Sequence, residues 1–285
     1  MRTLRFRQVD VFTQVPFRGN PVAVVLDGDG LDAEQMQRIA RWTNLSETTF
    51  LQQPGAPQAD YRLRIFTPHA ELPFAGHPTI GSAHAVLEAG IASPKAGKMR
   101  QECGAGVLEL SVTDGMLWVR APRHEIRSLE AARAAELARV LGAPLSGSPV
   151  SVRVGPEWIV ADLGSAQAVA ALVPDMAAIG RFSAALGATG ITVFGASKGE
   201  GAALHVRSFA PAHGVPEDPV CGSGNVSVAA YLSHSGELRR YGARCEARQG
   251  MQLGRDGRVA MRVEEGAILL GGRAVTCVEG TLRVD

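Results

Sequence analysis

The spacing of apolar positions along the chain changes period several times. Between residues 60 and 67, apolar side chains alternate with Arg62 and Arg64, which is the pattern of a strand with one buried face. After Asp32 the apolar residues recur at helical spacing, and Asp32 with Gln35 can form a capping box at the start of that helix. The same reasoning predicts strands at 4–12, 21–26, 47–52, 60–67, 150–163, 190–195 and 202–209, between 90 and 120 and from 243 onward, and helices at 32–43, 78–89, 128–141, 175–186 and 223–233.

Strands and isolated helices are mixed without regular alternation, so we predict an α+β protein. The two halves also resemble each other, because residues 66–90 and 209–236 both run from a strand through an acidic loop to a glycine-containing turn that opens a helix of small residues. We therefore expect two similar lobes, residues 1–118 and 119–285, with a final strand near 275–285 returning to the first lobe. We expect the active site in a cleft between them, with both helix starts facing it.

The glycine-containing turns before these two helices are candidate anion sites. The first N–H groups of a helix have no partner within the helix, and glycine lets a ligand come close to the backbone. The donors would be the amides of Gly76, Gly222 and Ser223. Tight turns before packed helices would explain one such loop, but two matched loops with polar side chains favour a site for a small carboxylate.

Three further polar side chains are candidates for acid–base chemistry. Glu47 follows a predicted helix and begins an apolar strand, where loss of solvent would raise the pKa of its carboxyl toward neutrality. His77 lies at a predicted helix start, where the dipole favours its neutral form, and Asp218 precedes Pro219 in the second turn. Each also has a purely structural explanation: a surface or capping glutamate, a loop histidine with satisfied hydrogen bonds, and a turn-forming aspartate.

Cys221 is the remaining candidate. A thiol at a helix N-terminus has a lowered pKa, so Cys221 could be a reactive thiolate. The matching residue of the first half is Ala75, so a mechanism with two thiols lacks its second thiol. A small buried residue at a turn is the simpler explanation.

The composition excludes several classes of function. A net charge of +1 and an aromatic content of 5% give no basis for binding nucleic acid or an anionic membrane surface. The start of the chain has no apolar core of a signal peptide, and no apolar run reaches the roughly 20 residues that span a bilayer, so we expect a cytoplasmic protein. The four cysteines and seven histidines show no metal-ligand spacing, and nucleotide-binding motifs are incomplete, so we expect neither a metal nor a cofactor.

Several motifs are distributed in order over nearly the whole chain: Phe12, Phe17-Arg-Gly-Asn-Pro-Val-Ala-Val-Val25, Ser46-Glu-Thr-Thr-Phe50, Arg64-Ile-Phe-Thr-Pro68, Glu71-Leu-Pro-Phe-Ala-Gly-His-Pro-Thr79 and Glu217-Asp-Pro-Val-Cys-Gly-Ser-Gly224. Together they closely resemble the PhzF-like family of phenazine biosynthesis proteins. The resemblance implies a fold like that of diaminopimelate epimerase, in which each lobe is a strongly curved sheet around a central helix. It also implies a homodimer that uses no cofactor.

The resemblance further implies roles for individual residues. In the phenazine enzyme, the glutamate matching Glu47 moves a proton in the isomerisation of dihydro-3-hydroxyanthranilate. By the same resemblance, the side chains of His77 and Asp218 position polar groups of the substrate. Ser46, Gly76, Gly222 and Ser223 would help to hold the substrate and its carboxylate.

One position departs from the phenazine enzyme, which resembles this chain but has threonine where Cys221 stands; related epimerases and proline racemases have cysteine there. Three hypotheses therefore remain open. The first is an isomerase of a small carboxylate that depends on Glu47. The second is a one-thiol epimerase, racemase or dehydratase that uses Cys221 with Glu47. The third is a small-carboxylate binding protein without catalysis, against which the combination of Glu47, His77 and Asp218 argues.

Overall fold

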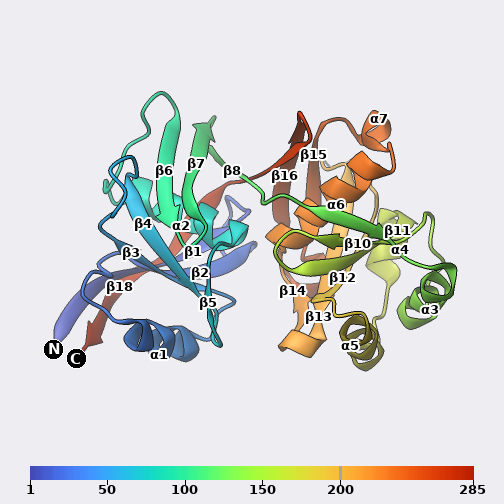
Figure 1. The fold of residues 1–285 in the computed structure, drawn as a ribbon, viewed down its shortest axis with the longest axis horizontal. Coiled ribbons are helices and arrows are strands. Elements are labelled where there is room, and N and C mark those ends of the chain that lie inside the picture. Colours follow the sequence, from blue (N-terminus) through green and yellow to red (C-terminus); the bar gives the residue numbers. More distant parts are fainter. Residues whose placement is uncertain (199–200) are drawn as a thin grey trace. The chain divides into compact units, whose positions relative to one another are not determined.

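The computed structural model describes residues 1–198 and 201–285, and the chain divides into two compact units (Figure 1). Unit 1 consists of Met1–Arg120 together with Gly271–Asp285, and unit 2 consists of Ala121–Leu270. The last strand of the chain therefore belongs to the same unit as the first.

Unit 1 is a mixed sheet with two helices. Its elements are β1 (Arg2–Val11), β2 (Asn20–Val25), α1 (Ala33–Thr43), β3 (Thr48–Gln52), β4 (Tyr61–Phe66), β5 (Glu71–Leu72), α2 (Gly76–Glu88), β6 (Lys98–Cys103), β7 (Gly106–Thr113), β8 (Met116–Arg120) and β18 (Ala274–Val284). The capping box expected at the start of α1 is present, since Asp32 accepts from the N–H of Gln35 and Gln35 bonds back to Asp32. Strand β18 pairs antiparallel with β1 from Arg2↔Val284 to Val11↔Ala274.

Helix α2 is the central helix of unit 1 (Figure 1). It contacts strands β1, β2, β8 and β18, and nine of its thirteen residues are buried. A Cβ on Gly81 would lie 2.4 Å from Cγ1 of Val22 and 2.7 Å from Cγ2 of Val11, so this close contact of helix and sheet needs glycine. The run of small residues that predicted this helix is thus what lets the sheet surround it.

Unit 2 is also a mixed sheet with helices. Its elements are β9 (Glu125–Ser128), α3 (Ala131–Leu141), β10 (Val150–Arg153), β11 (Glu157–Ser165), α4 (Ala166–Ala171), α5 (Met176–Ala185), β12 (Gly190–Ala196), β13 (Leu204–Ala210), the 3-10 turn η1 (Pro211–His213), β14 (Val215–Asp218), α6 (Gly222–His234), α7 (Leu238–Tyr241), β15 (Arg244–Gln249), η2 (Met251–Leu253), β16 (Gly257–Glu264) and β17 (Ala267–Gly272), which leads back to unit 1. Helix α6 is central and contacts β10, β11, β12 and β16. Helices α3, α4 and α5 cover a separate apolar cluster that includes Leu137, Val169 and Ile179.

The two units share one strand topology. In unit 1, β1 to β4 pair in sequence, with β2 and β3 parallel, and β4 then pairs parallel with β6, which pairs antiparallel with β7. In unit 2, β10 to β13 pair in sequence, with β11 and β12 parallel, and β13 pairs parallel with β15, which pairs antiparallel with β16. The central helix follows the fifth strand of each series, β5 or β14. The internal resemblance read from two short loops therefore extends to whole units.

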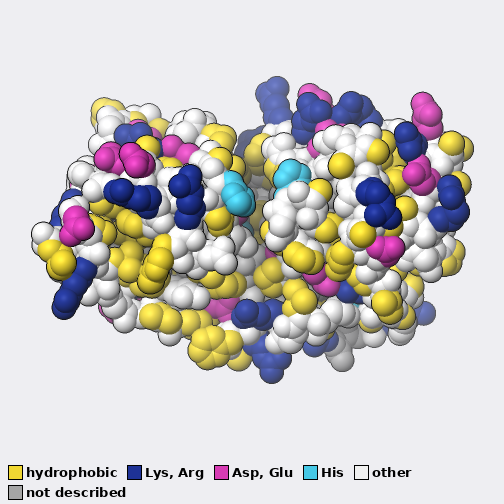
Figure 2. Space-filling view, turned by 90° about the horizontal axis from the view of Figure 1, so that it is seen from below, with side chains coloured by type: hydrophobic (Ala, Val, Ile, Leu, Met, Phe, Trp, Pro, Cys, Tyr) yellow, Lys and Arg dark blue, Asp and Glu magenta, His cyan; other side chains and the backbone are white. Residues whose placement is uncertain are grey.

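On the face shown in Figure 2, basic and acidic side chains are interspersed and do not gather by sign. Among the helices of residues 1–198 and 201–285, none is both long and apolar enough to cross a membrane.

Candidate active site

Glu47 and His77 of unit 1 are joined by a hydrogen bond. Glu47 directly precedes β3, and its Oε2 lies 2.9 Å from Nδ1 of His77, the second residue of α2. Their side chains are 17% and 6% exposed, so solvent and salt weaken the attraction between them little. The fold thus brings together two of the three side chains that the sequence offered for acid–base chemistry.

The hydrogen bond of Nε2 of His77 determines how many protons the Glu47–His77 pair carries. Nε2 of His77 lies 2.9 Å from the backbone oxygen of Asn20. Because a carbonyl oxygen only accepts, Nε2 carries a hydrogen, and one further proton is shared between Nδ1 of His77 and Oε2 of Glu47. The pair is either imidazolium with carboxylate or neutral imidazole with carboxylic acid, and the two states differ by proton movement within one hydrogen bond.

The carbonyl of Asn20 is held by a buried turn. The N–H of Gly19 donates to Oδ2 of Asp10 over 2.9 Å, and Asp10 is only 2% exposed. A Cβ on Gly19 would lie 2.1 Å from the backbone oxygen of Val11, so no other residue fits there. In the sequence this segment is recognisable only as part of a motif, and its role in orienting His77 is visible only in the structure.

The start of α2 offers a backbone donor in the same unit. Ala75 is the N-cap residue and supplies no side-chain acceptor, and Pro78 has no N–H. The N–H of Thr79 bonds to the backbone oxygen of Ala75, whereas the N–H of Gly76 has no acceptor within the described part of the chain. Ser46, the neighbour of Glu47, is half-buried.

The start of α6 offers two such donors in unit 2. The N–H of Gly224 bonds to Sγ of Cys221 over 3.3 Å, and the N–H of Asn225 bonds to the backbone oxygen of Cys221. The N–H groups of Gly222 and Ser223 bond to no other group of residues 1–198 and 201–285. Two adjacent donors at the positive end of a thirteen-residue helix form a local environment that favours an anion.

The side chain of Ser223 is oriented by a residue that the sequence analysis did not single out. Nε1 of Trp158, on β11, donates to Oγ of Ser223 over 3.0 Å. Because Oγ accepts from the indole, its own hydrogen points elsewhere, and Sγ of Cys221 lies 3.6 Å from the oxygen. The hydroxyl is thereby set up to donate.

Asp218 is the last residue of β14, four positions before α6 begins. Its Oδ1 accepts from the N–H of Val220 over 3.0 Å, which is the turn-forming bond considered in the sequence analysis.

Cys221 is a buried thiol rather than an exposed nucleophile. Its residue is 4% exposed, and burial together with the charge of Asp218 raises the pKa of the thiol well above its usual value. The lowering expected from the helix N-terminus is therefore outweighed by the loss of solvent. At neutral pH the sulfur is protonated, and it serves as the acceptor that caps α6.

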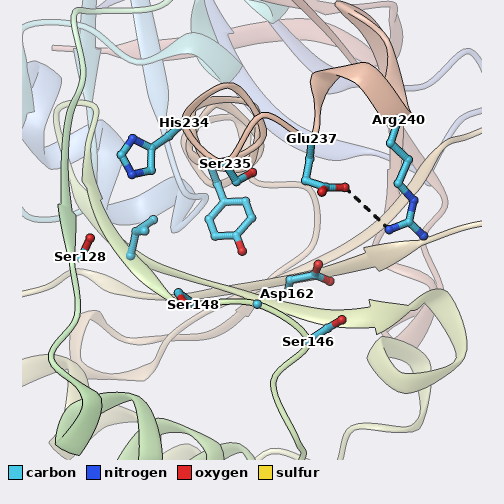
Figure 3. A pocket seen from close by; sticks show the side chains of 11 residues that line it. Ser128, Ser146, Ser148, Asp162, His234, Ser235, Glu237 and Arg240 are labelled. Carbon is cyan, nitrogen blue, oxygen red and sulfur yellow. Dashed lines mark ion pairs between the residues drawn. The ribbon is translucent and has the colours of Figure 1, made fainter.

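A surface pocket of about 410 Å³ lies at the other end of α6 (Figure 3). Four serines contribute to its wall, as do Asp162, His234, and the ion pair of Glu237 with Arg240. Burial raises the pKa of Asp162. None of the site residues expected from the sequence lines this pocket, and α6 separates it from Gly222 by roughly 18 Å along the helix axis.

The side chains that could bind metal ions are scattered. Within residues 1–198 and 201–285, no three His, Cys, Asp or Glu side chains come close enough to hold an ion together.

Comparison with known proteins decides the family. A model of phenazine biosynthesis-like proteins, the PhzC-PhzF family, matches residues 9–280. The chain belongs to this family. As a member of the PhzC-PhzF family, it carries the Glu47–His77 pair and the Gly222–Ser223 turn within the segment that the family model covers.

Individual relatives match the PhzC-PhzF chain over almost its full length. A Schizosaccharomyces pombe protein described as antisense-enhancing sequence 1 is 42% identical, covering 96% of this chain and 97% of its own. The trans-2,3-dihydro-3-hydroxyanthranilate isomerase of Pseudomonas aeruginosa is 38% identical, covering 96% of this chain and 94% of its own. Because members of the family are isomerases, this PhzC-PhzF chain is an isomerase.

Solved structures confirm the predicted fold. The Bacillus anthracis phenazine biosynthesis protein of the PhzF family superposes with a TM-score of 0.84 at 26% identity, covering 100% of both chains. A hydroxyproline epimerase from Agrobacterium vitis superposes with a TM-score of 0.65 at 14% identity, covering 99% of this chain and 92% of its own, which shows a shared fold. The expected α+β, epimerase-like architecture is correct.

Proposed function

We propose that this isomerase moves a proton between two carbons of a small aminocarboxylate, with Glu47 as the proton carrier. The substrate is trans-2,3-dihydro-3-hydroxyanthranilate or a close relative. The observation that carries the proposal is the 2.9 Å hydrogen bond between Oε2 of Glu47 and Nδ1 of His77, whose Nε2 is committed to the carbonyl of Asn20. The isomerase of Pseudomonas aeruginosa, which is 38% identical, supports the choice of substrate class.

The proton count of the pair determines how it works. In the imidazolium–carboxylate state His77 donates to Oε2, so Oε1 of Glu47 is the oxygen that takes a proton from a substrate carbon. The electron pair of the broken C–H bond moves into the conjugated system of the substrate, and protonated Glu47 then returns the proton to a different carbon. No atom or electron is gained or lost, and acid–base groups positioned in this way typically accelerate such steps by about 10²–10⁴-fold.

We propose that the amides of Gly222 and Ser223 bind the substrate carboxylate. Both N–H groups lie at the positive end of α6 and have no acceptor within residues 1–198 and 201–285. Gly76 and Ser46 add polar contacts in this proposal. Asp218 holds the amino group, because a carboxylate attracts an ammonium ion. Cys221 contributes an uncharged side chain beside the substrate, and its sulfur accepts the hydrogen bond that caps α6.

The test is turnover of trans-2,3-dihydro-3-hydroxyanthranilate in D₂O by wild type and by Glu47→Gln, followed by proton NMR. Wild type should convert the substrate to an isomer of the same mass, apart from solvent deuterium at the new C–H position. Glu47→Gln should bind with similar affinity and lose at least about 10²-fold in kcat, because the amide keeps the shape but cannot take up the proton. Glu109→Gln, which removes a carboxylate paired with Lys98 on the exposed side of β7, is the matched control.

Two outcomes would sink the proposal. If Glu47→Gln retains the kcat of wild type, Glu47 is not the proton carrier. If wild type exchanges deuterium at a single carbon with loss of stereochemistry, the one-thiol epimerase hypothesis replaces the isomerase mechanism.

A further inference from the structure

The turn that opens α6 is held by the buried amide of Gln249, the last residue of β15. Oε1 of Gln249 accepts from the N–H of Cys221 over 3.1 Å and from Nδ2 of Asn225 over 2.8 Å. Nε2 donates to the backbone oxygen of Asp218 over 3.0 Å. The side chain is fully buried, so water does not compete for these bonds.

Asn225 completes this arrangement from inside the helix. Its Nδ2 donates both to Oε1 of Gln249 and to the backbone oxygen of Cys221 over 2.8 Å, and Asn225 is fully buried as well. The two amides therefore bond to the backbone at both ends of the segment from Asp218 to Cys221. The N–H of Cys221 is bonded to Gln249, whereas the next two N–H groups, those of Gly222 and Ser223, have no acceptor within residues 1–198 and 201–285.

The segment also lies directly on the sheet. A Cβ on Gly250, which has a φ of +96°, would come within 2.4 Å of the backbone oxygen of Pro219. A Cβ on Gly257 would come within 2.3 Å of Cγ2 of Val220. Two glycines thus let the strands approach the turn closely enough for Gln249 to reach it.

We propose that Gln249 is a positioning residue that sets the direction of the Gly222 and Ser223 amides and thereby the affinity for the substrate carboxylate. The inference rests on the proposed function in assigning the carboxylate to these amides. Gln249 does not touch the substrate in this account. It acts through the backbone of Asp218 and Cys221, and it needs both an acceptor and a donor at the end of its side chain.

The variant Gln249→Glu separates these two requirements. When protonated, the introduced carboxyl can accept from Cys221 and Asn225 and donate to the oxygen of Asp218, as the amide does; when ionised, it loses the donor. Burial raises the pKa of such a carboxyl, so the change falls within an accessible range of pH. Asp218 and Cys221, whose backbone Gln249 contacts, are titratable residues next to this position, and Arg248, its neighbour in β15, is paired with Asp256.

The experiment follows the Gly222 amide of [¹⁵N]glycine-labelled protein by NMR from pH 5.5 to 8.5, beside KM and kcat for trans-2,3-dihydro-3-hydroxyanthranilate. In Gln249→Glu the Gly222 resonance should match wild type at low pH and move away as the pH rises. KM should rise about tenfold over wild type at high pH while kcat changes less than about threefold, since one buried hydrogen bond is lost. Gln101→Glu makes the same substitution at a fully buried glutamine of unit 1 and should leave the Gly222 resonance in place.

The results separate this inference from the proposed function. A Gly222 resonance that is identical in Gln249→Glu and wild type at every pH overturns the positioning role, whatever the substrate. A shifted resonance with unchanged KM overturns the link to carboxylate binding. Absence of turnover by wild type removes the proposed function alone, and the Gly222 resonance still decides whether Gln249 sets the turn.

Discussion

Replacing Arg207 by Met would remove one half of a buried ion pair next to the second candidate turn. Nε and Nη2 of Arg207, on β13, each donate to one carboxylate oxygen of Glu217 over 2.8 Å, and the side chains are 4% and 6% exposed. Nη1 also donates to the backbone oxygens of Val169 and Leu172, over 3.2 and 2.7 Å. One guanidinium therefore joins the end of α4 to the strand that carries Asp218.

The expected loss of unfolding free energy depends on which buried groups each variant leaves without a partner. Arg207→Met leaves the Glu217 carboxylate buried without its cation, which costs about 3–5 kcal/mol of unfolding free energy. The double variant Arg207→Met/Glu217→Leu removes that charge and leaves the carbonyl of Leu172 without its donor, while the oxygen of Val169 still accepts from the N–H of Leu172, so it should lose about 1–3 kcal/mol. The double variant should therefore be more stable than the single one, although it departs further from the wild-type sequence.

The assay is hydrogen exchange measured by mass spectrometry on peptides of β13 and β14 across a guanidinium series. Peptide resolution is needed because a chain of two units does not have to unfold in one transition. Arg133→Met, which breaks an exposed pair with Glu136 on α3, is the control and should change stability by less than about 1 kcal/mol. Wild-type stability in Arg207→Met, or a double variant weaker than the single one, would refute the reasoning.

Two shorter predictions concern single side chains of unit 2. Cys221→Ser should keep most of the turnover, because burial and Asp218 raise the pKa of this thiol and leave it protonated; a loss in kcat as large as that of Glu47→Gln would instead make Cys221 a second acid–base group. Burial lowers the pKa of His205 below its usual 6.5, so the unfolded chain binds this proton more readily and stability should fall as the pH drops below about 6.5. His205→Gln should weaken that fall in urea midpoints measured between about pH 7.5 and 5.5, and an unchanged slope would contradict the assignment.

The sequence predicted correctly those helix ends that depend on neighbouring residues, such as a cap or a terminal glycine. The capping box of Asp32 with Gln35 and the glycine at position 142, which ends α3 with a φ of +63°, are both where the sequence put them. The start of α3 was predicted too early, at Ser128. That residue lies in β9 and pairs with Val150, because pairing with a distant strand outweighs its preference for a helix cap.

The candidate site was predictable in its side chains but not in its hydrogen bonds. Glu47 and His77 stood out by residue type and motif, whereas the state of their shared proton depends on the carbonyl of Asn20, 57 positions from His77. One feature of the sequence could have indicated Gln249: it is a polar residue on the same face of its strand as Cys245 and Ala247. The turn that it holds lies 28 positions earlier, and no local pattern connects the two.

The pairing of β18 with β1 has a consequence for the order in which the units form during synthesis. Unit 2 is one continuous segment, Ala121–Leu270, so all of its residues are synthesised before β18. In unit 1, β1 lacks one of its neighbouring strands over its whole length until β18, Ala274–Val284, has been synthesised. Domains generally fold as units during synthesis, so unit 2 is able to fold before unit 1, although most of unit 1 is synthesised earlier. The Glu47–His77 pair lies in unit 1, the unit that is completed last.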